Sequence, residues 1–388
     1  MRSRGRSEMP RFLFLTWNGA GNQPPAAAIA QALRRRGHEI TFAGYANQRC
    51  YFVERGFRFI LLGRSAAAWR DEAPERMFDV KLQAAWASSD HLLDLPRLIS
   101  EERCDALVID CLMFGALAAA ESTHVPVATL IHSAPGALMP PKGKFESQVL
   151  GSVNELRVKA GLPSVGSLWE SWARFPSLSN SIRQLDPLAA QAPVAFTYLG
   201  PISEELPPCG WKPPWPANDR RPLILVSFST GPYWDQTSRI LRTLDAIRGR
   251  NCRVLVTAGS TELDPATVPD NATIVRRIPH DEILPHVAVT VTHAGHGTVT
   301  ASLKHGVPLL CLPNPAADQP ILAAQIQNLG CGLSLEGETA TSSEIGKSID
   351  RLISVSSFAA NARSLANAIS RSPGISTAVS RLEELCAP

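Results

Sequence analysis

The sequence lacks an apolar run of the roughly 18 residues or more that a membrane-spanning helix needs, so no membrane span is expected. It also lacks a Cys-x-x-Cys pair: eight cysteines are scattered without zinc-ligand spacing, as expected of reduced thiols in a cytoplasmic protein. A large excess of one charge is absent too, because 38 Lys and Arg oppose 35 Asp and Glu. This balance gives no field that favours nucleic acid, and small-molecule partners are expected instead.

Alternating strand and helix patterns run through both halves of the chain. Its 388 residues exceed one ordinary domain of roughly 100–200 residues, so two domains are expected. Apolar runs with little period-two alternation predict strands buried on both faces, within parallel α/β sheets. The expected strands are 11–16, 38–43, 104–110, 125–132, 223–228, 253–257, 273–276, 287–292 and 309–312, and the expected helices are 26–36, 115–123, 238–248, 298–305 and 319–329.

Two stretches interrupt this alternation. Residues 134–195 hold many Pro, Gly and Ser residues and predict a long irregular insertion, which is often functional. Residues 200–222 are dense in proline and predict a linker. We therefore place a first domain at 1–205, a linker at 206–222 and a second domain at 223–372. Because open parallel sheets bind ligands at the carboxyl ends of their strands, a ligand-binding cleft between the two domains is expected.

The segment 293–298 (His-Ala-Gly-His-Gly-Thr) joins a predicted strand to a predicted helix. Gly295 and Gly297 let the backbone approach a ligand, and the helix start supplies unpaired N–H groups, which together predict an anion site. His293 and the Thr298 hydroxyl, expected at the helix cap, add hydrogen bonds for a diphosphate. A plain tight turn with Thr298 as its cap is the alternative. The sequence has no Asp-x-Asp motif, in keeping with a metal-free arrangement.

One strand and helix later, Asp318 and Gln319 open the next predicted helix. The carboxyl ends of neighbouring parallel strands meet at one edge of the sheet, so these side chains are expected near the anion site. A carboxylate and an amide there suit sugar hydroxyls. A helix-capping role for Asp318 ahead of Pro320 is the alternative.

In their order, these motifs resemble the donor-binding signature of family 1 glycosyltransferases. The resemblance begins at Ile278-Pro279-His280, includes 293–298 and Asp318-Gln319, and ends at Leu329-Gly330. It is strongest to actinobacterial enzymes that glycosylate macrolides, enediynes and aromatic polyketides. It implies the GT-B fold, an α/β architecture of two Rossmann-like, doubly wound parallel-sheet domains facing each other across a cleft. It also implies that a C-terminal helix at 373–388 crosses back to the first domain.

The resemblance further implies a metal-independent, inverting transfer of a sugar from a TDP- or UDP-sugar co-substrate, with no cofactor, to a hydroxyl or amine of a hydrophobic natural product. The sugar, the nucleobase, the acceptor and the formation of a homodimer stay open. The implied donor-binding residues are Ser229, Thr230, Gly259, Ile278, Pro279, His293, Gly295, His296, Gly297, Thr298, Asp318 and Gln319.

The general base of this family is missing from its usual place. Gly21-Asn22-Gln23 resembles the loop in which most relatives carry a histidine, and an amide cannot accept a proton near neutral pH. Asp110 matches the carboxylate that orients that histidine. We expect Asp110 to act itself, through a water or with His132, while Asn22 orients the acceptor. Turn-forming and capping roles are the alternatives for these residues.

Aromatic side chains in or near the irregular parts of the first half suit a large apolar acceptor. A place in the core is the alternative for each of them. The candidates for acceptor binding are Trp86, Phe145, Trp169 and Trp172.

Three other functions share parts of this pattern. A nucleotide-dependent dehydrogenase is disfavoured because residues 19–24 lack the third glycine of its fingerprint and the second strand ends without a carboxylate for a ribose. A nucleotide-sugar epimerase shares the two-domain fold. A donor-binding helper protein without a general base fits Asn22, and it would show neither donor hydrolysis nor transfer to a small phenol.

Overall fold

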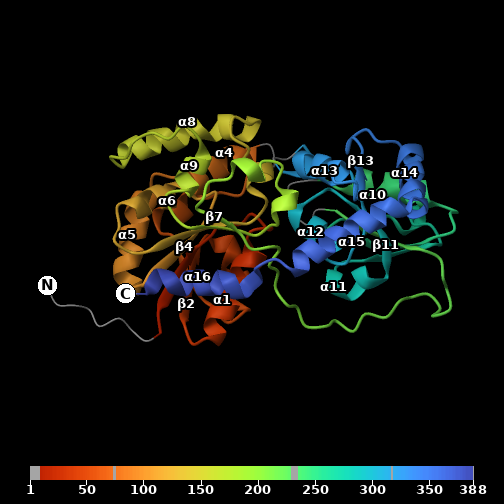
Figure 1. Cartoon of the computed structure of the whole chain (residues 1–388), viewed down its shortest axis with the longest axis horizontal. Helices are drawn as coiled ribbons and strands as arrows, with labels where there is room; N and C mark the ends of the chain where they lie inside the picture. Colours follow the sequence, from red (N-terminus) through yellow and green to blue (C-terminus); the bar gives the residue numbers. More distant parts are fainter. Residues whose placement is uncertain (1–8, 73–75, 229–234, 316–317, 388) are drawn as a thin grey trace. The chain divides into compact units, whose positions relative to one another are not determined.

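The computed structural model describes residues 9–72, 76–228, 235–315 and 318–387, and the chain divides into two compact units (Figure 1). Unit 1 comprises Met1–Arg183, Leu188–Glu204 and Pro373–Pro388, and unit 2 comprises Gln184–Pro187 and Glu205–Ser372. Each unit contains one parallel sheet. No helix in the described ranges is both long and apolar enough to cross a bilayer.

The sheet of unit 1 has the strand order β3-β2-β1-β4-β5-β6-β7, and all its neighbours pair in parallel. The chain runs outward from β1 on one side and from β4 on the other, so the two ligand-binding loops of a doubly wound sheet follow β1 and β4. Its strands are β1 Arg11–Leu15, β2 Glu39–Gly44, β3 Arg58–Leu61, β4 Ala106–Asp110, β5 Val127–Ile131, β6 Ser177–Ser179 and β7 Phe196–Tyr198.

Strand β1 shows why these sequences form buried strands. Its side chains point alternately to the two faces of the sheet, with Leu13 and Leu15 in one hydrophobic core and Phe12 and Phe14 in the other. Both faces are covered by helices, so the strand carries no polar alternation. The predicted α/β class with doubly wound parallel sheets is confirmed, and every expected strand is present with ends shifted by at most two residues.

The helices of unit 1 correct one expectation. Residues 134–195 contain helices and a strand instead of an irregular insertion, and α8 alone has 16 residues. Its apolar stripe is short, and Arg157, 1% exposed, is held by an ion pair to Glu121 of α6. The helices are α1 Gln23–Arg35, α2 Arg49–Val53, α3 Arg64–Ala68, α4 Met77–Lys81, the π-helical η3 Leu82–Trp86, α5 His91–Glu102, α6 Phe114–Glu121, α7 Pro135–Leu138, α8 Lys144–Lys159, α9 Leu168–Trp172 and α16 Gly374–Cys386.

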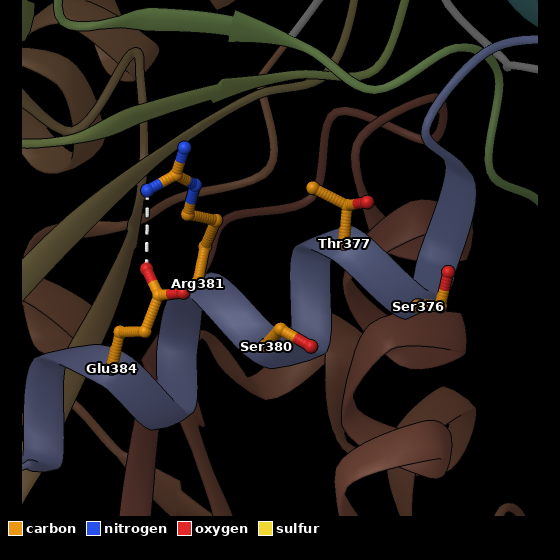
Figure 2. A pocket seen from close by; sticks show the side chains of 5 residues that line it. All are labelled: Ser376, Thr377, Ser380, Arg381 and Glu384. Carbon is orange, nitrogen blue, oxygen red and sulfur yellow. Dashed lines mark hydrogen bonds and ion pairs between the residues drawn. The ribbon is translucent and has the colours of Figure 1, made fainter.

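Helix α16 belongs to unit 1 although it ends the chain. It lies beside α1 (Figure 1) and adds Ala378, Val379 and Leu382 to the core that contains Phe12. Its opposite face is polar, and Figure 2 shows the pocket that this face lines. All the lining residues come from this one helix: Ser376, Thr377, Ser380, Arg381 and Glu384.

Unit 2 repeats the same winding with the strand order β10-β9-β8-β11-β12-β13, so its ligand-binding loops follow β8 and β11. Its strands are β8 Leu223–Ser227, β9 Arg253–Thr257, β10 Ala272–Val275, β11 Val287–Thr292, β12 Leu309–Cys311 and β13 Gly332–Ser334. Its helices are α10 Thr237–Ile247, α11 His280–Ile283, α12 His296–Lys304, α13 Gln319–Asn328, α14 Ser342–Ser354 and α15 Ser356–Ser370.

The proline-rich stretch expected as a linker at 206–222 is part of unit 2. Trp211 and Trp215 pack against the small core cluster that contains Leu223 and Ile278. The two indoles therefore help to attach this stretch, which has few other apolar side chains, to the unit, together with the hydrogen bond from the Cys209 N–H to Glu282.

The packing of α16 gives a stability prediction. Leu382 is fully buried, so Leu382→Ala is expected to lower the free energy of unfolding of unit 1 by about 2–5 kcal/mol. The measurement is urea unfolding followed by tryptophan fluorescence. The matched control on the polar face, Glu384→Ala, removes only an exposed ion pair with Arg381 and should change the midpoint little. Equal effects of the two substitutions would show that α16 is not packed as described.

Candidate active site

The carboxyl edge of the unit 1 sheet is built around Asp110, the last residue of β4, which is 4% exposed. Oδ1 accepts hydrogen bonds from Trp17 Nε1 at 2.9 Å and from the Leu112 backbone N–H at 3.0 Å. Oδ2 accepts from Asn22 Nδ2 at 3.1 Å and lies 3.0 Å from His132 Nδ1. Three N–H donors and an imidazole nitrogen therefore surround one carboxyl group.

His132 follows β5 and forms an imidazole–carboxylate pair with Asp110. Since an ionised carboxylate only accepts hydrogen bonds, Nδ1 carries the proton and Nε2 of the neutral ring has a free lone pair. Burial, the largest influence, lowers the pKa of His132, but the nearby Asp110 and Cys111 and the hydrogen bonds to both outweigh it and hold the pKa well above the usual value. The side chain keeps 12% exposure, so a ligand can reach the ring.

Asn22, at the start of α1, is fully buried, and both ends of its amide are used. Oδ1 accepts a hydrogen bond from the Gly19 N–H at 3.2 Å. Besides Asp110, Nδ2 contacts the Thr16 hydroxyl at 3.2 Å and the Trp17 carbonyl oxygen at 2.9 Å. Asn22 therefore has a structural role: it fixes the loop after β1 and positions Asp110, and a direct contact with an acceptor stays a prediction.

Cys111 completes this cluster, with its Sγ 3.6 Å from His132 Nδ1. The thiol, the Asp110 carboxylate and the imidazole lie within 4.8 Å of one another, a spacing that a cation could also use. Burial raises the pKa of the Cys111 thiol, however, and both Asp110 oxygens already accept hydrogen bonds. We therefore interpret the three residues as a hydrogen-bonded cluster.

The carboxyl edge of the unit 2 sheet presents the turn between β11 and α12. Ala294 has φ 64°, a left-handed conformation that is strained for a non-glycine residue and is often found at functional sites. Gly295 occupies the N-cap position of α12 and makes no side-chain cap at the start of the helix. The helix starts at His296, two residues before the expected start, and Thr298 is therefore not the cap.

His293 lies against this turn and is 9% exposed. A Cβ at position 295 would lie 2.4 Å from His293 Nε2, so Gly295 is required for the imidazole to pack here. Burial, and secondly the charge of Arg239, lower the pKa of His293 to about 4. The ring is thus neutral near pH 7 and can donate one hydrogen bond to a ligand.

Asp318 and Gln319 lie at the start of α13, as expected. Asp318 occupies the N-cap position, but its side chain makes no capping hydrogen bond. Gln319 is 8% exposed and its Oε1 accepts a hydrogen bond from the Asn314 N–H at 3.1 Å. This bond fixes the amide so that its NH₂ group is the end available to a ligand.

The remaining donor candidates follow β9 and β10. Gly259 takes a left-handed φ of 60° in the turn after β9. The Ile278 side chain is buried in the small core cluster, so only its backbone can flank a base, and Pro279 caps α11. The neighbouring His280 lies 3.2 Å from the Ser227 hydroxyl at the end of β8. Ser229 and Thr230 lie outside the described residues.

Sequence comparisons relate the second half of the chain to a known group. Residues 241–385 match the family model described as "Erythromycin biosynthesis protein CIII-like, C-terminal domain". Over nearly the whole chain, 4'-demethylrebeccamycin synthase of Lentzea aerocolonigenes is 25% identical, with 97% of this chain and 99% of the relative covered. Demethyllactenocin mycarosyltransferase of Streptomyces fradiae is also 25% identical, with 99% and 88% covered.

Solved structures agree over the whole length. The glycotransferase of kitacinnamycin superposes with a TM-score of 0.80 at 19% identity, covering 98% of this chain and 100% of that one. The spinosyn rhamnosyltransferase SpnG complexed with thymidine diphosphate superposes with a TM-score of 0.69 at 18% identity, covering 97% and 100%. The chain is a glycosyltransferase of the GT-B fold.

An aromatic cluster adjoins Asp110 in this glycosyltransferase. Trp17, which donates to Asp110, meets Trp86 edge-on at 5.5 Å between ring centroids. Trp86 in turn contacts Phe78 at 5.5 Å and Phe145 at 5.2 Å. Phe78 and Phe145 are only partly buried, so this cluster offers apolar surface next to the imidazole–carboxylate pair. Lys81 lies over the Trp17 ring at 5.8 Å, and burial lowers its pKa to about 8.

The other two aromatic candidates are core residues. Trp172 is fully buried, stacks on Phe114 and donates a hydrogen bond from Nε1 to the Cys111 carbonyl oxygen at 2.7 Å. Trp169 is 4% exposed and packs against Phe196. These rings fix the fold around Cys111, and the structure does not place them at a ligand surface.

Sequence reasoning did not select Trp17 and Asn314, which donate hydrogen bonds to the candidate residues Asp110 and Gln319. Trp17 follows β1 directly and Asn314 comes shortly after β12, so both stand at carboxyl ends of strands where site residues concentrate. That position was the available signal. Neither residue belongs to a motif with fixed spacing, and so neither was selected.

The close approach of Gly295 to His293 gives a second prediction. Gly295→Ala forces the buried imidazole or the backbone to move and should lower the free energy of unfolding by about 1–3 kcal/mol. A Cβ on Gly297 meets nothing within 4 Å, so Gly297→Ala should leave stability unchanged or raise it by up to about 1 kcal/mol. Thermal unfolding of both variants measures the difference. A stable Gly295→Ala protein would contradict the described packing of His293.

Proposed function

We propose that this glycosyltransferase moves a sugar, with inversion and without a metal, from a TDP- or UDP-sugar to a hydroxyl or amine of a hydrophobic natural product. The observation that carries the proposal is the His132–Asp110 pair at the carboxyl edge of unit 1. It supplies the proton acceptor that Asn22 cannot supply.

In the proposed step, the acceptor O–H donates its hydrogen bond to His132 Nε2. As the oxygen attacks the anomeric carbon, the proton moves to Nε2 and the bond from this carbon to the phosphate oxygen breaks. Nucleoside diphosphate leaves from the opposite face, which inverts the configuration. Asp110 stabilises the imidazolium that forms and keeps Nδ1 protonated.

The leaving diphosphate needs positive potential, which many sugar transferases take from a metal ion. Three features support a metal-free alternative in this chain. The start of α12 has no side-chain cap and carries the positive end of the helix dipole, and the neutral His293 adds a donor. Ala294 takes a left-handed φ of 64° in this turn, a strained conformation that is often found at functional sites.

The names of related proteins and the side chains of this chain both support the proposed classes of sugar donor and acceptor. SpnG binds thymidine diphosphate, and the synthase and transferase relatives carry names of rebeccamycin and macrolide chemistry. The partly buried Phe78 and Phe145 beside Trp86 suit a flat or apolar acceptor. We propose Asp318 and the Gln319 amide as sugar ligands, since they hold a carboxylate and an NH₂ group at the start of α13.

The function is tested by incubating the protein with TDP- and UDP-sugars and a small phenol. Transfer, with an inverted anomeric configuration by NMR, is expected at the same rate with EDTA as with added Mg²⁺. Loss of activity in EDTA would contradict metal independence. A protein that binds donor but shows neither transfer nor donor hydrolysis would instead be a helper without catalytic activity.

The pH dependence tests the base. Because protonated His132 cannot accept a proton, kcat/KM should fall as the pH falls through its raised pKa, above the usual histidine range. His132→Gln should lower kcat by about 10²–10⁴-fold and abolish this acid limb. The measurement is a pH profile of kcat/KM for the wild type and the variant.

Asp110→Asn separates the two members of the pair. Without the carboxylate charge the pKa of His132 falls, so the acid limb should move to lower pH while the maximal rate also drops, since the tautomer is no longer fixed. His124→Gln, at an exposed histidine outside this cluster, is the control and should keep the wild-type limb. An unchanged limb in Asp110→Asn would exclude the proposed pair.

A further inference from the structure

Arg239 is a buried cation without a counter-ion in the part of the chain that the structure describes. It lies in the first turn of α10 and is 6% exposed. Among the described residues its guanidinium makes one hydrogen bond, a long one of 3.5 Å to the Pro313 carbonyl oxygen, and no ion pair. The Nε–H is buried and has no acceptor.

A buried guanidinium without a counter-ion is energetically unfavourable unless a ligand supplies the opposite charge. Burying an ionised side chain without a partner costs several kcal/mol, so native proteins rarely keep one outside a binding site. Burial lowers the pKa of Arg239, and Glu338 and Asp235 attract it only without direct pairing. An arginine stays protonated nonetheless, because its ordinary pKa is so high.

A second unpaired donor lies in the same region. Asn314 is fully buried and its Nδ2 has no hydrogen-bond acceptor, while its Oδ1 accepts from Gln236 Nε2 at 3.3 Å. Asn314 directly follows Pro313, whose carbonyl oxygen contacts Arg239. The orphan amide and the orphan guanidinium therefore flank the same end of β12.

This region adjoins the turn that contains His293. The charge of Arg239 acts on the pKa of the His293 imidazole, which stays neutral, so Arg239 supplies the full positive charge there. The planar guanidinium fork matches two oxygens of a phosphate group. Unpaired hydrogen-bond donors and a positive charge at one edge of the sheet favour the binding of an anionic ligand.

We infer that Arg239 and the Asn314 amide bind the diphosphate of the nucleotide-sugar and of the nucleoside diphosphate that leaves. The inference rests on the proposed function and adds to it two residues outside the recognised motif. Arg239 then serves as the fixed charge that many transferases take from a metal ion. Its effect grows as the leaving oxygen becomes negative, so it contributes to kcat as well as to binding.

The test is calorimetric titration of the full chain with TDP, TMP and thymidine, and with the matching uridine series. Arg239→Gln and Arg239→Met should weaken the binding of the diphosphate about 10–100-fold, weaken the monophosphate less and leave the nucleoside unchanged. Arg239→Lys keeps the charge and loses the planar fork, so its affinity for the diphosphate should lie between that of these two variants and that of the wild type. Asn314→Ala should weaken the binding of the diphosphate by a smaller factor.

The matched control is Arg242→Gln, one turn further along α10. Arg242 is half-buried, but it donates to the Gly337 carbonyl oxygen at 2.7 Å and to the Ser238 hydroxyl at 2.9 Å. Its removal should change diphosphate affinity less than threefold, a ratio that corresponds to a small free-energy difference.

The apo protein provides the second readout. If Arg239 binds an anionic ligand, Arg239→Met removes an unpaired buried charge from the free protein and should not lower its unfolding temperature. Added TDP should then raise the unfolding temperature of the variant less than that of the wild type. A diphosphate affinity within threefold of the wild type, or an equal loss for the nucleoside, would overturn the inference. A wild type that binds neither TDP nor UDP would instead refute the proposed function itself.

Discussion

The buried carboxylate of Asp110 is the constraint on which the rest of unit 1's site depends. An ionised group in this position is tolerable only if hydrogen-bond donors replace the water it has lost. The donors come from the loop after β1, from the turn after β4 and from the end of β5. Satisfying one side chain therefore ties three strand ends together, and the same requirement fixes the tautomer of His132.

This arrangement explains how an asparagine can occupy the usual place of the base. Asn22 supplies a hydrogen bond to Asp110 and ties the loop to Thr16 and Trp17, so its amide has a structural role. The imidazole partner of the carboxylate comes from β5 instead. An imidazole–carboxylate pair needs one distance and one tautomer, and it does not depend on which loop carries the histidine.

The carboxyl edges of the two sheets are electrostatic opposites. In unit 1 an anion of the protein itself is surrounded by donors. In unit 2 the Arg239 guanidinium and the Asn314 amide are buried and keep donors that no described residue accepts. The carboxylate of the first edge therefore finds its donors within the fold, whereas the second edge keeps unpaired donors, for which a diphosphate is proposed above. This contrast follows from the same winding, which brings loops from both sides of each sheet to its carboxyl edge.

The sequence by itself determined the fold class, the long strands and the place of the donor turn, because strands buried on both faces and glycine-marked turns leave local patterns. It did not reveal α8 as a helix, since only a few of its side chains form the apolar stripe and its ends are rich in proline and glycine. Only the tertiary structure decided the surroundings of Asn22, Trp172 and Arg239. Burial and hydrogen-bond partners come from segments distant in sequence: Asn22 meets Asp110, Trp172 meets Cys111 and Arg239 meets Pro313. No local pattern encodes such pairings, because they exist only once the sheets have assembled.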